Sequence, residues 1–132
     1  MYLLDTNVCI ALLNGTSEPA WRRLQASPVR DVAICSTVKS ELLFGARRSQ
    51  CVEANLQTLQ KFFEPFLSLP FDDRCAEEAA IIRTSLAEQG RPVGPHDLMI
   101  AAIARANDRI LVTHDQQEFY RIAGLRLEDW QA

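Results

Sequence analysis

The sequence has no apolar run near the roughly 20 residues that a membrane-spanning helix needs. Its amino terminus also lacks the basic and then apolar order that marks a signal peptide. These absences predict a cytoplasmic protein that does not act at a membrane. With 132 residues, 48% of them hydrophobic, the chain can bury one core but not two, so we expect a single domain over residues 1–132.

Paired cysteines and glycine-rich motifs are absent as well. No two of Cys9, Cys35, Cys51 and Cys75 have Cys-x-x-Cys spacing, and three of them stand among apolar neighbours. Reduced, buried side chains are therefore expected rather than zinc ligands or disulfides. The chain also contains no Walker loop and no G-x-G-x-x-G or G-x-S-x-G pattern, which argues against a nucleotide-phosphate loop or a serine nucleophile.

Positive charge is scarce, since the formal net charge is −3 and binding to nucleic acid normally needs a basic surface. The objection weakens if four acids bind metal, because the rest of the molecule would then carry +1. Most of the 14 basic residues are arginines, whose planar guanidinium suits phosphate, and Arg22-Arg23 and Arg47-Arg48 are adjacent pairs. An ordinary solvated helix face is still the simpler explanation of any one pair.

Short apolar segments alternate along the chain with segments of helical periodicity. Strands are expected at residues 2–4, 32–35 and 109–113, with shorter ones at 67–69 and 125–127. Helices are expected from Val8 up to Gly15, after Pro19, from a Ser36 or Thr37 cap to about Arg48, and at 52–66, 72–90, 97–107 and 116–122. Apolar strands that alternate with helices predict an α/β fold, a three-layer α/β/α sandwich with a parallel central sheet.

Four acids fall where such a sheet binds ligands, beyond the carboxyl ends of its strands. Asp5 closes the first strand, Asp115 follows the strand at 109–113, and Asp97 opens a helix. Glu41 lies one turn inside the helix after the second strand, and both it and Asp97 occupy positions where the periodicity asks for an apolar residue. An unpaired charge at such a position is costly, so each acid needs a partner.

Each acid also has a purely structural explanation. Asp115 and Glu118 match a capping box, Asp97 could complement a helix dipole, and Asp5 could close a turn. Glu41 is harder to explain in this way, because its helix offers no obvious basic partner. Taken together, converging carboxylates would repel by roughly 4 kcal/mol per close pair at an effective dielectric constant near 20. A divalent cation would relieve that repulsion.

Oxygen ligands without a cysteine or histidine cluster favour Mg²⁺, with Mn²⁺ as a possible substitute, over Zn²⁺. Thr6, Asn7 and Thr113 add hydroxyl and amide groups beside the acids, where they could orient them. Hydrolysis of a phosphodiester by a metal-activated water is the chemistry that such a site supports.

Four segments carry a resemblance to a known family: YLLDTN at 2–7, STVKSELLFG at 36–45, PHDLMIAA at 95–102 and ILVTHD at 110–115. The chain resembles PIN-domain nucleases, in particular VapC-type toxins of bacterial toxin-antitoxin pairs. The resemblance implies a metal-dependent endoribonuclease acting on RNA, tRNA being a fair guess, that forms a homodimer and is inhibited by a cognate antitoxin. It also implies that Asp5, Glu41, Asp97 and Asp115 are the catalytic cluster, with Asp5, Asp97 and Asp115 holding the metal and Thr113 supporting them.

The two histidines, His96 and His114, each directly precede an acid of this cluster, where the family often has asparagine. They are either surface loop residues, the interpretation we favour, or groups that contact phosphate or tune the pH optimum. A second open question is the apolar stretch from Leu56 to Phe66, which fits a core helix and, less well, a dimer or antitoxin surface.

Two other functions are compatible with an acidic pocket in an α/β chain. A magnesium-binding receiver-like signalling module would need an early acidic pair and a lysine at a strand end. Here Asp72-Asp73 lies mid-chain, and Lys39 and Lys61 fall inside predicted helices. A non-catalytic binding protein that keeps the PIN fold is disfavoured by the presence of all four acids, although fold alone does not determine function.

Overall fold

The computed structural model describes all of residues 1–132. The strands are β1 (Tyr2–Leu4), β2 (Val32–Cys35), β3 (Leu67–Leu69), β4 (Ile110–Val112) and β5 (Leu127–Glu128). The α-helices are α1 (Thr6–Asn14), α2 (Glu18–Ala26), α3 (Ser36–Arg47), α4 (Val52–Phe63), α5 (Asp73–Glu88) and α6 (Pro95–Ala106). Two 3₁₀ turns, η1 (Val29–Asp31) and η2 (Gln116–Glu118), complete the chain.

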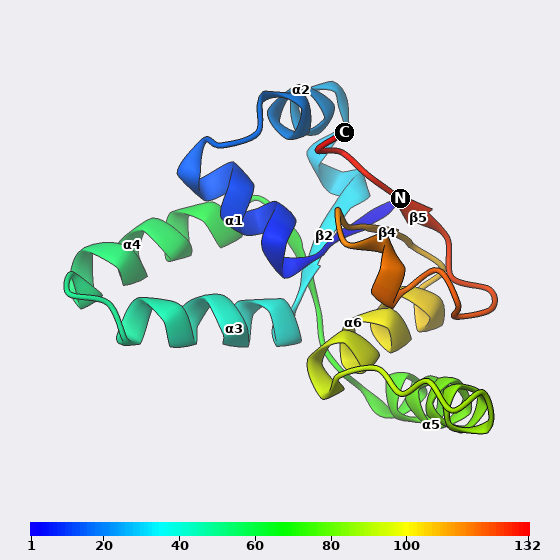
Figure 1. The fold of residues 1–132 in the computed structure, drawn as a ribbon. Helices are drawn as coiled ribbons and strands as arrows, with labels where there is room; N and C mark the ends of the chain where they lie inside the picture. Colours follow the sequence, from blue (N-terminus) through cyan, green and yellow to red (C-terminus); the bar gives the residue numbers. More distant parts are fainter.

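All five strands are parallel and form one sheet in the order β3-β2-β1-β4-β5. The first strand of the chain is therefore the central one, and residue Leu4 pairs with Val112 of β4. Crossover connections between parallel strands are right-handed. The connections from β1 to β2 and from β2 to β3 run in one direction along the sheet, and the connection from β3 to β4 runs in the other, so their helices lie on opposite faces of the sheet. Figure 1 shows α1, α3 and α4 on one side of the strands and α5 and α6 on the other, which confirms the predicted three-layer α/β/α sandwich.

Burial explains why these segments adopt this structure. All four residues of β2 are buried, as expected for an interior strand of a parallel sheet, and so are five consecutive residues of α6, Ile100–Ala104. Cys9, Cys35 and Cys75 are buried and Cys51 is exposed, and none forms a disulfide, as the sequence predicts. None of the helices combines the length and the apolar content that a membrane span requires.

Helix ends are where the structure departs from the sequence-based expectations. Cys35, and not Ser36 or Thr37, occupies the cap position of α3, and no side chain caps that helix. The helix expected over residues 116–122 is only the 3₁₀ turn η2, and the last strand lies at 127–128 rather than 125–127. These boundaries depend on tertiary pairing, which local periodicity does not contain.

Candidate active site

Asp5 connects β1 and β4 at their carboxyl ends. Its backbone N–H donates to the Val112 carbonyl at 3.0 Å, and the residue also forms the cap of α1. Asp5 Oδ1 accepts from the Thr6 backbone N–H at 2.7 Å, and Oδ2 accepts from the Thr113 hydroxyl at 2.8 Å. Only 5% of Asp5 is exposed, so this carboxylate is fixed in position by its neighbours.

The pKa of Asp5 lies above its ordinary value. Burial is the largest cause, and the negative charges of Glu41 and Asp115 add to it. The hydrogen bonds from Thr113 and Thr6 act in the opposite direction, because both stabilise the ionised form. Asp5 is thus a carboxylate under electrostatic stress that a nearby cation would relieve.

Glu41 approaches this group from α3, on the same edge of the sheet. Its Oε1 accepts from the Thr6 hydroxyl at 2.9 Å, and its Oε2 lies 3.7 Å from His96 Nδ1. The side chain is 29% exposed, which is half-buried rather than fully inward. Thr6 therefore joins Asp5 to Glu41, using its backbone for the first and its hydroxyl for the second.

Asp97 lies in the first turn of α6 and is half-buried. Its pKa is raised to about 6, first by burial and then by the negative charges of Asp5, Glu118, Glu41 and Asp115. A carboxylate that served only to complement the helix dipole would be stabilised in its ionised form. The upward shift therefore favours a site shared with other acids over the purely structural explanation.

Asp115 follows β4 and precedes η2, and it is exposed. Its side chain makes no capping hydrogen bond, so the capping-box explanation of Asp115 is wrong. Its charge instead contributes to the raised pKa values of both Asp5 and Asp97. The charges of Glu41 and Asp115 thus both reach Asp5 and Asp97.

The predicted supporting residues differ in what they contact. Thr113 is completely buried and bonds Asp5, and Thr6 bridges two of the acids as described above. Asn7 is exposed and lines a groove of about 730 Å³ between α1, α3 and α4, a groove that Thr6 and Glu41 also line. The structure therefore ties both threonines to the acids but leaves Asn7 at the entrance to the neighbouring groove.

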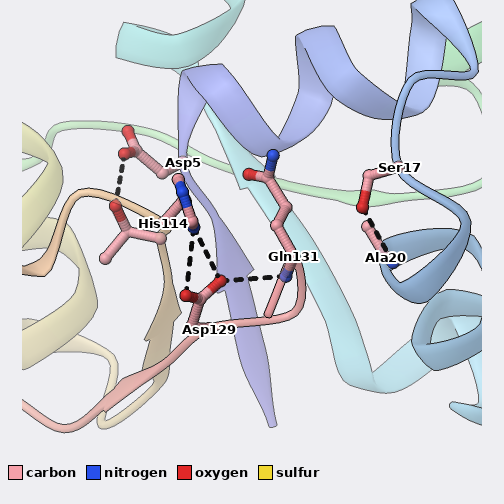
Figure 2. Close-up of polar contacts among 7 residues, drawn as sticks. Asp5, Ser17, Ala20, His114, Asp129 and Gln131 are labelled. Carbon is pink, nitrogen blue, oxygen red and sulfur yellow. Dashed lines mark hydrogen bonds and ion pairs between the residues drawn. The ribbon is translucent and has the colours of Figure 1, made fainter.

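Both histidines are exposed. His96 lies in the first turn of α6, so its expected loop position is wrong, whereas His114 is in the loop after β4. His114 Nδ1 lies 3.0 and 3.2 Å from the two oxygens of Asp129, which also accepts from the Gln131 backbone N–H at 2.9 Å (Figure 2). Figure 2 draws the pair together with Asp5, whose hydrogen-bond partner Thr113 directly precedes His114.

Sequence reasoning missed two acids of this region. Glu118 adds its charge to that of the others on Asp97, and Asp129 holds His114. The spacing of Glu118 from Asp115 was visible in the sequence, but it resembled a cap. Nothing local marked Asp129, because it faces His114 only through the pairing of β4 with β5.

The donor set around Asp5 consists of carboxylate and hydroxyl oxygens, which suits a hard divalent cation such as Mg²⁺. Mutual charge repulsion among the acids points the same way, since it raises two of their pKa values. The grouping is loose, because no three acidic, histidine or cysteine side chains lie close enough to hold one ion as they stand. Side-chain rotation would be needed for direct coordination.

Comparison with known proteins places this geometry in a family. The PIN domain model matches residues 2–125. The tRNA(fMet)-specific endonuclease VapC of Shigella flexneri is 40% identical over 98% of this chain and 97% of its own. Ribonuclease VapC2 of Rickettsia felis is 34% identical over 98% of each chain.

Solved structures agree. The chain in the DNA-bound VapBC complex of Salmonella typhimurium superposes with a TM-score of 0.92 at 37% identity, covering 98% of this chain and 97% of that one. The VapBC2 complex of Rickettsia felis bound to a promoter DNA fragment gives 0.91 at 33% identity, covering 98% of both. The fold, the order of the acidic segments and these matches over nearly the full length lead to one conclusion: the chain belongs to the PIN-domain family.

Proposed function

We propose that the protein is a Mg²⁺-dependent endoribonuclease and the toxin of a type II toxin-antitoxin pair. The observation that supports this most directly is the convergence of Asp5, Glu41, Asp97 and Asp115, which come from four separate segments and whose negative charges help to raise the pKa values of Asp5 and Asp97. The close relatives named as VapC ribonucleases support the same activity. Mg²⁺ dependence is a proposal from the chemistry of the donor set.

In this proposal Asp5, Asp97 and Asp115 hold the ion, and Mn²⁺ could replace Mg²⁺. When bound, the ion would polarise the phosphodiester and make water a stronger nucleophile at neutral pH. Glu41 completes the catalytic group, held in place by the Thr6 hydroxyl. The hydrogen bonds from Thr113 and Thr6 orient Asp5 and favour its ionised form, which is the contribution of the protein itself to the geometry.

Transfer RNA is the proposed substrate class, because two relatives at 40% and 37% identity are named for cleavage of tRNA(fMet). The test is incubation of total tRNA with the purified protein and Mg²⁺, followed by mapping of the new RNA ends. Cleavage at a defined position is expected, and Asp5→Asn should abolish it. Unchanged cleavage in excess EDTA would refute the metal requirement while leaving the ribonuclease assignment in place.

A cognate antitoxin is the proposed protein partner, since several similar structures are VapBC toxin-antitoxin complexes. A basic antitoxin side chain placed among the four acids would compete with the metal and so inhibit cleavage. Salt-dependent relief of inhibition, measured with a purified toxin-antitoxin complex, would test this charge substitution.

The protein is also proposed to form a homodimer. The predicted apolar stretch packs against the core, where Leu59 is buried and Phe63 is half-buried, with Lys39 Nζ 5.1 Å from the centre of its ring. The core-helix interpretation of residues 56–66 is therefore the better one. Sedimentation over a range of protein concentrations would determine the oligomeric state.

A receiver-like function finds no support in the contacts. Asp72 caps α5 by accepting from the Cys75 backbone N–H at 3.1 Å, and Lys39 packs on Phe63 rather than ending a strand. A non-catalytic PIN-fold binding protein differs from the proposed enzyme in one measurable way, because it would bind RNA with Mg²⁺ but leave the RNA intact.

The two histidines give the proposal a finer test. We favour a surface role for both, so replacing His96 and His114 with asparagine should leave the dependence of cleavage rate on pH unchanged. A shifted pH optimum in the double variant would instead favour a role in phosphate contact or pH tuning.

A further inference from the structure

A second hollow, apart from the groove beside Glu41, lies on the other flank of the acids. Its volume is about 410 Å³, and its lining residues are Arg91, Gln117, Glu118, Tyr120 and Arg121. Two segments build it: the loop between α5 and α6, yellow-green in Figure 1, and the chain that follows β4. Nothing in the proposed catalytic chemistry uses these side chains except the charge of Glu118.

Arg121 holds the two segments together. Its guanidinium donates to the Pro92 carbonyl at 3.1 Å and lies 3.7 Å from Glu118. Only 16% of its side chain is exposed, and its Nε is buried without a hydrogen-bond partner. Arg121 is therefore a fixed and largely buried part of the wall of the hollow.

Arg91 and Tyr120 are the exposed members of the hollow. Tyr120 is 63% exposed, so its ring is accessible to a partner. The Arg91 guanidinium forms no ion pair, and the acid that also lines the hollow, Glu118, lies 3.7 Å from Arg121. A free guanidinium beside an open aromatic ring is the recurring chemistry for an unpaired nucleotide, whose base stacks and whose phosphate takes the charge.

The hollow adjoins the acids on two sides. Glu118 lines it and is close enough to Asp97 to raise the pKa of that carboxyl. Gln117 comes two residues after Asp115, and the loop that carries Arg91 runs directly into the first turn of α6. A strand whose phosphate reached the four acids could therefore place a neighbouring nucleotide in the hollow.

We propose that this hollow binds an unpaired RNA nucleotide next to the scissile phosphate, with its base against Tyr120 and a phosphate at Arg91. The inference rests on the proposed ribonuclease function and names a substrate subsite for it. Because an aromatic ring can stack on any base, Tyr120 contributes affinity without base specificity. Arg91 contributes the part of the binding affinity that depends on salt concentration.

The test measures binding of a labelled initiator tRNA transcript by the full-length Asp5→Asn protein, which retains the hollow but should not cleave. Tyr120→Leu should weaken binding by roughly tenfold with no change in salt dependence, and Tyr120→Phe should bind normally. Arg91→Ala should weaken binding and reduce the slope of log affinity against log salt by about 0.7, the value for one phosphate on a single strand.

Arg30→Ala is the matched charge control. Arg30 is exposed in η1, which directly precedes β2, so it lies at the amino-terminal ends of the strands, away from the acids at their carboxyl ends. The proposal is overturned if Arg91→Ala behaves like Arg30→Ala, or if Tyr120→Leu binds as tightly as its parent. Cleavage by the same variants in an active background separates the two claims. Intact RNA with the unmutated protein refutes the ribonuclease, whereas normal cleavage and binding by both hollow variants refutes only the subsite.

Discussion

The hydroxyl of Thr113, the residue after β4, donates a 2.8 Å hydrogen bond to Oδ2 of Asp5, the residue after β1. Thr113 is completely buried. Its hydrogen bond acts to lower the pKa of Asp5, whereas burial acts to raise it. This hydroxyl therefore orients the carboxylate and, together with the Thr6 backbone N–H, favours its ionised form.

Removal of that hydroxyl should affect stability and activity together. We expect Thr113→Val to lose about 1–2 kcal/mol of unfolding free energy, because Asp5 Oδ2 loses its donor. Cleavage should fall by about tenfold or more, since the carboxylate is no longer oriented. Thr113→Ser, which keeps the hydroxyl, should restore activity, and both effects can be followed by thermal denaturation and initial cleavage rates.

Asp97 should lower stability at neutral pH when no metal is present. Its folded pKa of about 6 exceeds the ordinary 3.8. The folded state therefore binds more protons between these values, and stability falls as pH rises through that window. Above pH 6 in EDTA, we expect Asp97→Asn to unfold about 3 °C higher than the parent, a gain of roughly 1 kcal/mol after allowing for solvent screening.

The same measurement carries its own control. Below about pH 3, position 97 is essentially uncharged in the folded and unfolded states of both proteins, so their melting temperatures should agree. Added Mg²⁺ should stabilise the parent and not the variant, because only the parent retains the proposed ligand. Equal stabilisation of both by Mg²⁺ would argue against Asp97 as a metal ligand.

Cleavage should weaken below about pH 6 when Mg²⁺ is limiting. Protons and metal compete for Asp97, whose pKa of about 6 places half-protonation there. Raising the Mg²⁺ concentration should move the acidic limb of the pH-rate profile to lower pH. A limb that stays in place across a wide range of Mg²⁺ would show that another group controls it.

The carboxylates themselves should be required for catalysis but not for folding. Asp5→Asn or Asp97→Asn should reduce cleavage by more than about 100-fold, because a proposed metal ligand is lost. The circular dichroism spectrum should be retained, because the substitution removes a charge that repels its neighbours. EDTA should have the same effect on the unmutated protein, and Mg²⁺ or Mn²⁺ should reverse it. Failure of added metal to restore cleavage would contradict a reversible metal requirement.

Arg109 provides a stability variant that should spare the chemistry. It is 7% exposed at the start of β4, and its guanidinium donates to the carbonyls of Tyr2 and Asp31 at 3.2 and 3.3 Å. Arg109→Met keeps the apolar stem but removes the side-chain donor to both carbonyls, at a cost of about 1–3 kcal/mol. At temperatures well below melting, its cleavage rate should match that of the parent.

The sequence predicts most of the fold because local signals and burial agree. The apolar run at 32–35 is a buried strand, and the cap at Asp72 begins α5 as expected. The four acids were predictable for a related reason, since each stands at a strand end or on an otherwise apolar helix face.

The remaining features depend on contacts between distant parts of the chain. Thr6 and Glu41 are 35 residues apart, and neither side chain signals the bond between them. His114 meets Asp129 only because β5 pairs with β4 at the edge of the sheet. The hollow around Tyr120 likewise forms only when the loop between α5 and α6 meets the chain after β4. Such features follow from tertiary assembly and have no local periodicity.

The central position of β1 has a further consequence. Its two neighbours in the sheet, β2 and β4, come from positions about 30 and 110 along the chain, so the acids become neighbours only when long-range pairing is complete. No autonomous fragment should retain partial turnover, and inactivation by urea should coincide with cooperative loss of secondary structure. Activity in this protein should therefore be present only when the whole domain is folded.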